Sequence, residues 1–127
     1  MKKIIKTKHA ASPIGPYNQA VMVNGFLYTS GQIAINPNTG ETEFESIEHE
    51  TNRIMKSLEA ILSEAKLDFS HVIKASIFIS DMDNFTKINE IYGSYFDDET
   101  APARETVQVA RLPKDANVEI SLIAFQG

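Results

Sequence analysis

The spacing of apolar residues switches between a strand-like and a helix-like period along this chain, and the order of those switches limits the folds open to it. Over residues 46–66 apolar side chains recur at every third or fourth position, which is typical of an amphipathic helix. Ser46 is a suitable N-cap, and Glu48 and Glu50 favour the first turn of a helix. The same spacing predicts a second helix through Phe85, Ile88, Ile91, Tyr92, Tyr95 and Phe96.

Segments rich in alternating or β-branched residues flank both helical patterns. Three precede the first helix, one lies between the helices and two follow the second; they span residues 4–5, 20–23, 26–30, 72–80, 105–110 and 118–125. Asn24-Gly25 between the second and third segments is a strong hairpin signal, because a type I′ turn needs positive φ at both positions. The order predicts one α+β domain over residues 1–127, with two helices on one face of a mixed sheet.

Alternation in the last two predicted strands divides their side chains between the two faces of the sheet. One set is apolar and is expected to face the helices: Val107, Val109, Val118, Ile120 and Leu122. The other set is mixed and is expected to face away: Arg104, Thr106, Glu119, Ser121, Ile123 and Phe125. A mixed face is either solvated or meets a partner, and symmetric self-association is the commonest partnership. We therefore expect an oligomer with polar pockets at its seams.

Two charged residues of the outward set have the chemistry to act on a small carboxylate. Arg104 follows the small, stiff segment 101–103, and a guanidinium grips a carboxylate through two parallel hydrogen bonds. Glu119 lies mid-strand, where a carboxylate is disfavoured, so it either positions water as a partly buried base or pairs with a lysine. Gly31 in a strand-like run is typical of a bulge or of a close backbone approach to something bound, and Tyr17 is either a core or a site residue.

Composition argues against several other kinds of chemistry. The chain has no cysteine, which excludes disulfides and thiolate catalysis. His9, His49 and His71 lack zinc-ligand spacing and the glycines form no nucleotide-binding motif, so we expect neither a zinc site nor nucleotide chemistry. A net charge of −5 argues against a nucleic-acid partner. No apolar run is long enough to span a membrane, and we expect a cytoplasmic protein.

Three stretches of this sequence resemble the RidA/YjgF family. They are Ile14-Gly15-Pro16-Tyr17, then Tyr28-Thr29-Ser30-Gly31-Gln32-Ile33, and the run from Ala101-Pro102-Ala103-Arg104 through Val109-Ala110-Arg111-Leu112-Pro113-Lys114-Asp115 to Val118-Glu119-Ile120. The resemblance covers nearly the whole chain. It implies a chorismate-mutase-like (YjgF-like) fold assembled as a homotrimer, in which the sheets line a central barrel and three clefts lie between subunits.

The resemblance also implies an activity. Family members hydrolyse 2-iminopropanoate and 2-iminobutanoate, which pyridoxal-phosphate enzymes release from serine and threonine, to 2-oxo acids and ammonia without a cofactor. This link to pyridoxal-phosphate enzymes is functional and implies no stable complex. By the same resemblance Arg104 binds the carboxylate, Glu119 holds the attacking water and the Gly31 backbone contacts the imine end. The residues that line the rest of the cleft are Tyr17, Ser30, Asn89 and Thr106.

The chain departs from the family at Thr106, where many members have a cysteine, and this departure bears on the range of substrates. Two other functions stay open. The first is a regulatory module that binds a small carboxylate without turnover, because a fold does not fix a function. The second is a ribonuclease or translation inhibitor, which the net charge of −5 and the lack of a basic stripe disfavour.

Overall fold

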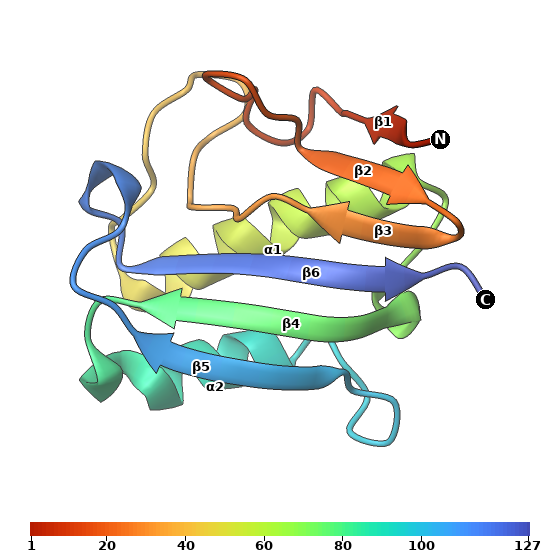
Figure 1. The fold of residues 1–127 in the computed structure, drawn as a ribbon. Helices are drawn as coiled ribbons and strands as arrows, with labels where there is room; N and C mark the ends of the chain where they lie inside the picture. The colour runs from red at the N-terminus through yellow and green to blue at the C-terminus, as the bar shows by residue number, and fades with distance from the viewer.

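A computed structural model describes all 127 residues of the chain, with six strands in one sheet and two helices on one of its faces (Figure 1). The strands lie side by side in the order β1-β2-β3-β6-β4-β5. They are β1 (Lys3–Ile5), β2 (Ala20–Val23), β3 (Phe26–Thr29), β4 (Val72–Ile79), β5 (Ala103–Gln108) and β6 (Val118–Phe125). The pair β4 and β5 is parallel and the other neighbours are antiparallel. The predicted mixed sheet with helices on one face is therefore confirmed.

The helices α1 (Ile47–Glu64) and α2 (Phe85–Gly93) lie on the same side of the sheet and pack against each other (Figure 1). Ser46 caps α1 as predicted, because its Oγ accepts a hydrogen bond of 3.0 Å from the backbone N–H of His49. The buried stripe of α1 holds Ile54, Met55, Leu58, Ile61 and Leu62. Single 3₁₀ turns η1 (Phe69–His71), η2 (Met82–Asn84) and η3 (Pro113–Asp115) link the larger elements. Neither helix combines the length and the hydropathy that crossing a membrane requires.

The turn between β2 and β3 has the predicted form, with φ of +50° at Asn24 and +84° at Gly25. Strand β3 of this hairpin pairs with β6, so the first strands of the chain lie beside its last strand in the sheet. In β4 a bulge between Val72 and Lys74 interrupts the alternation, and Ile73 is exposed.

Strand β5 lies at the edge of the sheet, and its side chains point to the opposite sides from those predicted. Its register with β4 pairs Arg104 with Ala75 and Thr106 with Ile77, and both partners are buried against the helices. Arg104 and Thr106 therefore face α2, whereas Val107 points to the uncovered side and is 40% exposed. The prediction for this strand is wrong because alternation shows which residues share a face but not which face is covered. An edge strand beside a short helix is exposed on both sides.

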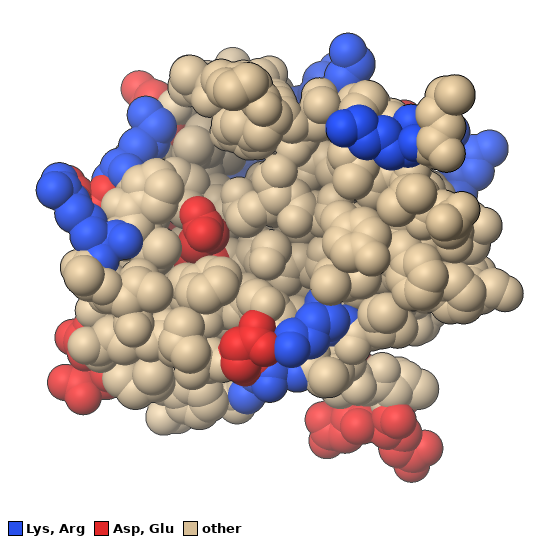
Figure 2. Space-filling view, viewed as in Figure 1, with Lys and Arg blue, Asp and Glu red and all other residues tan.

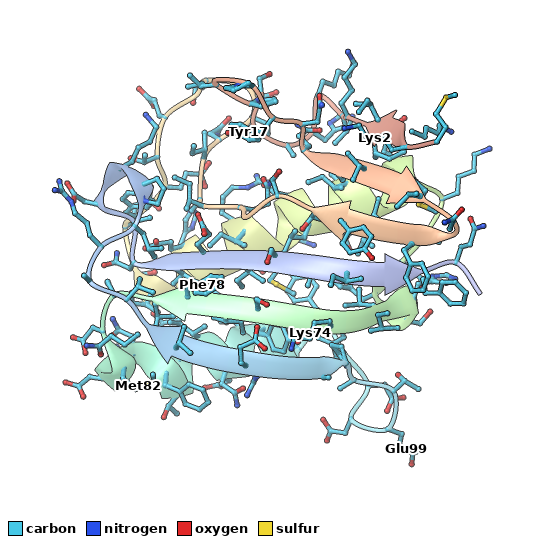
Figure 3. The ribbon with its side chains drawn as sticks, viewed as in Figure 1. Lys2, Tyr17, Lys74, Phe78, Met82 and Glu99 are labelled. Carbon is cyan, nitrogen blue, oxygen red and sulfur yellow. The ribbon has the colours of Figure 1, made fainter.

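The face of the sheet without helices, here called the open face, carries few charges across its middle (Figure 2). Aromatic side chains of neighbouring strands meet there, with the ring centroids of Phe26 and Phe125 4.6 Å apart. Lys74 and Phe78 lie along β4 in Figure 3. In β6 the alternation is as predicted: Ile120 and Leu122 are buried on the helix side and Glu119 is on the open face. A broad, weakly charged sheet face of this kind is typical of an interaction surface.

Candidate functional site

Glu119 lies on the open face of β6, directly beside the backbone of Gly31. Two backbone hydrogen bonds of 2.8 and 3.1 Å between Gln32 and Ile120 hold the chain after β3 alongside β6. A Cβ atom built at Gly31 would be 2.7 Å from Glu119 Cδ, so a larger residue would displace the carboxylate. The group that lies close to the Gly31 backbone is the Glu119 side chain, and the approach of this backbone to a bound molecule stays a prediction.

The Glu119 carboxylate is half-buried and receives no hydrogen bond from the chain. Burial alone raises its pKa above the ordinary range of a glutamate. It forms no ion pair either, although the chain makes six salt bridges elsewhere. Its acceptor sites are therefore free for water or a ligand, which favours the water-positioning base over the lysine-paired carboxylate among the two predicted roles.

A cavity of about 380 Å³ opens next to this carboxylate. Its lining consists of Ile14, Tyr17, Gly31, Ile33, Ile35, Pro113, Lys114 and Glu119. Tyr17 is half-exposed, so it is not part of the core, and Figure 3 places it in the segment leading to β2. An apolar lining with a few convergent polar groups is the usual composition of a small-molecule pocket.

Two polar residues hold the segment that carries Tyr17. The Ser30 hydroxyl donates a 2.5 Å hydrogen bond to the backbone oxygen of Asn18, so Ser30 positions this segment. Gln19 is 2% exposed, and its side chain bonds the backbone N–H of Thr7 at 2.7 Å and the backbone oxygen of Ala11 at 2.9 Å. Sequence reasoning missed Gln19, because a single amide in a loop has no periodicity to mark it as buried.

Arg104 belongs to a second cluster, on the helix side of β5. Its Nη1 donates a 2.5 Å hydrogen bond to Asn89 Oδ1 of α2. The guanidinium carbon lies 5.7 Å from the ring centroid of Phe85 and 5.2 Å from that of Tyr92. Asn89, which the resemblance placed in the cleft, is therefore in direct contact with Arg104.

Two hydroxyls near this cluster are buried without a hydrogen-bond partner, Tyr92 Oη and Thr106 Oγ1. Burial raises the pKa of Tyr92 to about 12, and the positive charge of Arg104 opposes that shift. Thr106 shares the face of Arg104, as the spacing predicted. An unpartnered buried hydroxyl costs stability unless a trapped water satisfies it.

The two clusters lie on opposite faces of the sheet. Glu119 is paired with Phe78 across β4, and Arg104 is paired with Ala75 on the other side of the same strand. Three residues along a strand and two strand spacings separate them by about 10 Å in each direction. Within one chain, a molecule of three or four carbons cannot touch both groups.

A fully buried carboxylate fixes the start of β6. Glu50 of α1 accepts a 2.8 Å hydrogen bond from Asn117 N and a 3.1 Å bond from Val118 N, and its other oxygen accepts a 2.8 Å bond from the Asn117 side chain. This contact anchors the strand one residue before Glu119. The sequence placed Glu50 in the first turn of the helix, as observed, but its burial was missed. Glu50 lies four residues before Ile54 on the buried stripe, and that spacing was the signal for its burial.

One group of side chains can hold a metal ion. Glu43, Glu45 and His49 each place a ligand atom within 4.8 Å of the others at the surface. His49 Nε2 lies 2.7 Å from Glu43 Oε1 and 3.1 Å from Glu45 Oε2, which a hydrogen-bonded ion pair explains equally well. None of these three residues lines the cavity beside Glu119.

A family model, curated relatives and solved structures all place this chain in the same family. The sequence pattern described as Endoribonuclease L-PSP matches residues 7–126. A RutC family protein of Synechocystis is 49% identical over 123 residues, covering 96% of this chain and 95% of that protein. A mouse protein named 2-iminobutanoate/2-iminopropanoate deaminase is 41% identical over 127 residues, covering 100% of this chain and 93% of its own length.

Solved structures agree with these relatives. A member of the Rid protein family from Yersinia pestis, YyfA, superposes with a TM-score of 0.95 at 46% identity, covering 98% of this chain and 99% of that one. TdcF of Escherichia coli, solved with bound serine, superposes with a TM-score of 0.92 at 41% identity over the same shares of the two chains.

Proposed function

We propose that this chain, which belongs to the RidA/YjgF family described as Endoribonuclease L-PSP, hydrolyses small 2-imino acids to 2-oxo acids and ammonia. The observation that carries the proposal is the unpartnered Glu119 carboxylate beside a small cavity. It is supported by the 41% identity, over the full chain, to a protein named for this reaction. The substrates proposed are 2-iminopropanoate and 2-iminobutanoate.

In the proposed reaction Arg104 binds the substrate carboxylate and Glu119 holds a water next to the imine carbon. The water oxygen bonds to that carbon while its proton passes to Glu119. With the imine protonated, this attack moves the C=N π pair onto nitrogen and gives a neutral amino alcohol. Glu119 returns the proton to that nitrogen, the C–N bond breaks to release ammonia, and the hydroxyl proton leaves through Glu119 as the carbonyl of the 2-oxo acid forms. The imine carbon is already electrophilic, so the site chiefly supplies orientation and a positioned water, and the proposal needs no cofactor.

The placement of the two charged groups implies that a second copy of the chain completes the site. Arg104 of one copy must meet the Glu119 cavity of another, because the two groups lie on opposite faces within one chain. The weakly charged open face is a suitable surface for that contact. We propose a closed homotrimer with three such sites, in the cytoplasm. Sedimentation of a stable monomer at micromolar concentration would contradict this assembly.

A coupled assay tests the activity. Threonine dehydratase generates 2-iminobutanoate, and semicarbazide traps the imine that persists. We expect the purified chain to reduce the trapped imine and to speed the appearance of 2-oxobutanoate. Unchanged trapping at a chain concentration that exceeds the dehydratase would refute imine hydrolysis.

The main alternative is a module that binds a small carboxylate or amino acid without turnover. The relative TdcF was solved with bound serine, which favours this candidate. Calorimetric binding of 2-oxobutanoate or serine together with an unchanged semicarbazide signal would support it over the enzyme. Degradation of RNA by the purified chain would instead support a ribonuclease, which the net charge of −5 disfavours.

A further inference from the structure

The helix α2 offers Arg104 three side chains from one face. Phe85, Asn89 and Tyr92 are spaced by four and three residues, so they project from the same side of the helix. That side faces β5, where Arg104 extends toward it from the sheet. An exposed arginine at a sheet edge ordinarily samples many rotamers, and here three contacts restrict it.

Two kinds of contact hold the guanidinium, cation–π contacts with two rings and one hydrogen bond. The two aromatic rings lie near its carbon at 5.7 and 5.2 Å, within the range of a cation–π contact. Asn89 accepts one of the five N–H groups. A carboxylate binds arginine through paired N–H groups in the plane of the guanidinium, and a cation–π contact occupies none of these donors as a hydrogen bond would.

We propose that Phe85 and Tyr92 are positioning residues that hold the Arg104 guanidinium ready for a carboxylate, with Asn89 setting which edge is free. This arrangement, here called the arginine cradle, consists of Phe85, Asn89 and Tyr92. It rests on the proposed function for its ligand. In this proposal Asn89 orients the Arg104 guanidinium. Tyr92 acts through its aromatic ring and not through its hydroxyl.

The unpartnered hydroxyl of Tyr92 makes the roles of ring and hydroxyl separable. Tyr92 is 5% exposed and its Oη bonds nothing in the chain. Tyr92→Phe keeps the aromatic face and removes only that oxygen, so KM and kcat for 2-iminobutanoate should stay within about twofold of wild type. Tyr92→Leu removes the face and should raise KM about fivefold to tenfold with kcat nearly unchanged.

Phe96 provides a matched control. Its ring lies 4.8 Å from that of Tyr92 and 5.3 Å from that of Phe69, and it makes no cation–π contact with Arg104. Phe96→Leu therefore loosens the same aromatic cluster without touching the guanidinium. We expect it to lower the melting temperature and leave KM unchanged. An equal rise of KM in Phe96→Leu and Tyr92→Leu would overturn the cradle in favour of general packing.

Asn89 gives a test of orientation. Asn89→Ala removes the acceptor and should raise KM only a few-fold, because the rings remain. Asn89→Asp places a carboxylate in front of the same N–H group, where it competes with the substrate, and should raise KM more than Asn89→Ala does. A KM for Asn89→Asp at or below that of Asn89→Ala would contradict the assigned role.

A spectroscopic readout separates the cradle from the proposed reaction. Aromatic ring currents shift the side-chain proton resonances of a stacked arginine upfield. In the wild-type chain the Arg104 side-chain protons should lie upfield, and Phe85→Leu and Tyr92→Leu should each move them toward ordinary values. A wild-type chain that shows these shifts but hydrolyses no imine would refute the proposed function and leave the arginine cradle intact. Ordinary Arg104 shifts in the wild type, or shifts unaffected by either variant, would overturn the cradle.

Discussion

The two halves of the candidate site are built in opposite ways. Arg104 is held from outside its own strand, by an amide acceptor and two rings of α2. Glu119 is flanked by the bare backbone of Gly31 and receives no hydrogen bond, and burial raises its pKa. A group that binds substrate benefits from a fixed geometry, whereas a group that must hold a water and move a proton needs free acceptor sites. The difference predicts that substitutions in the arginine half act mainly on KM and those in the glutamate half mainly on kcat.

The largest effect is expected at Arg104. Arg104→Ala should lower kcat/KM at least about 100-fold, because it removes two charge-assisted hydrogen bonds to the substrate carboxylate. Arg104→Lys should rescue little, since an ammonium group lacks the planar fork that grips a carboxylate. Steady-state kinetics in the semicarbazide assay measure both variants. Near-normal turnover by Arg104→Lys would refute the assignment of a two-pronged contact between Arg104 and the substrate carboxylate.

Glu119→Gln should lower kcat about 100-fold while KM changes little, because general base catalysis is lost and the amide still fits the space. Glu105→Gln is a matched control on the open face. The Glu105 carboxylate is engaged by Lys74 and by the Ser76 hydroxyl, which lower its pKa, so it is not available to hold a catalytic water. An unchanged kcat for Glu119→Gln would exclude Glu119 from the mechanism.

The raised pKa of Glu119 sets the direction of two pH effects. Its folded-state pKa lies above that of the unfolded chain, so its contribution to stability is present at low pH and is lost as the pH rises through the folded value. At neutral pH Glu119→Gln should therefore be at least as stable as wild type in thermal unfolding. The kcat of the wild type should rise with pH through the pKa of Glu119 in the assembled site, because the carboxylate form holds the water.

Gly31→Ala should lower kcat about tenfold with folding intact, because the new Cβ meets the end of a flexible side chain and pushes the Glu119 carboxylate aside. Gly93→Ala is the matched control, since a Cβ there meets no atom within 4 Å. Kinetics and melting temperatures of the two variants decide the point. Equal kcat values for both would show that the Glu119 position tolerates displacement.

The smallest effect is expected at Thr106. Thr106→Val removes a hydroxyl that has no partner in the chain, so a loss of about 1 kcal/mol in transition-state binding, several-fold in rate, is the most that one neutral hydrogen bond supplies. Thr106→Cys should retain most of the activity. A thousand-fold loss in Thr106→Val with intact folding would make Thr106 a primary catalytic group and would weaken the contrast between the two halves.

The sequence determines most of the element order because apolar periodicity is local information. The limits of β2 and β6 and the N-cap of α1 follow from it directly. The orientation of β5 does not follow from apolar periodicity. Val107 lies on the open face and Arg104 on the helix side, and the reverse arrangement would have the same alternation. Deciding between the two requires the packing of α2 against the edge strand, which is tertiary information.

The candidate site was predictable as a set of residue types, but not as an arrangement. Glu119, Gly31 and Tyr17 do share a cavity. Arg104 and Glu119 were predicted on the same face of the sheet, and the structure places them on opposite faces. The residues that hold the site, Gln19 and Glu50, are polar side chains in the interior. Their burial depends on partners distant in the sequence, and propensity arguments do not supply those partners.

In the proposed homotrimer, the division of the candidate site between the two faces of one sheet makes activity a property of pairs of chains. Two variants that are each inactive, Arg104→Ala and Glu119→Gln, carry complementary intact halves. After unfolding and refolding together in equal amounts, chains in a closed ring assort at random, and about one interface in four joins an intact arginine to an intact glutamate. The mixture should regain roughly a quarter of wild-type activity by intermolecular complementation, whereas a site contained within one chain would regain none.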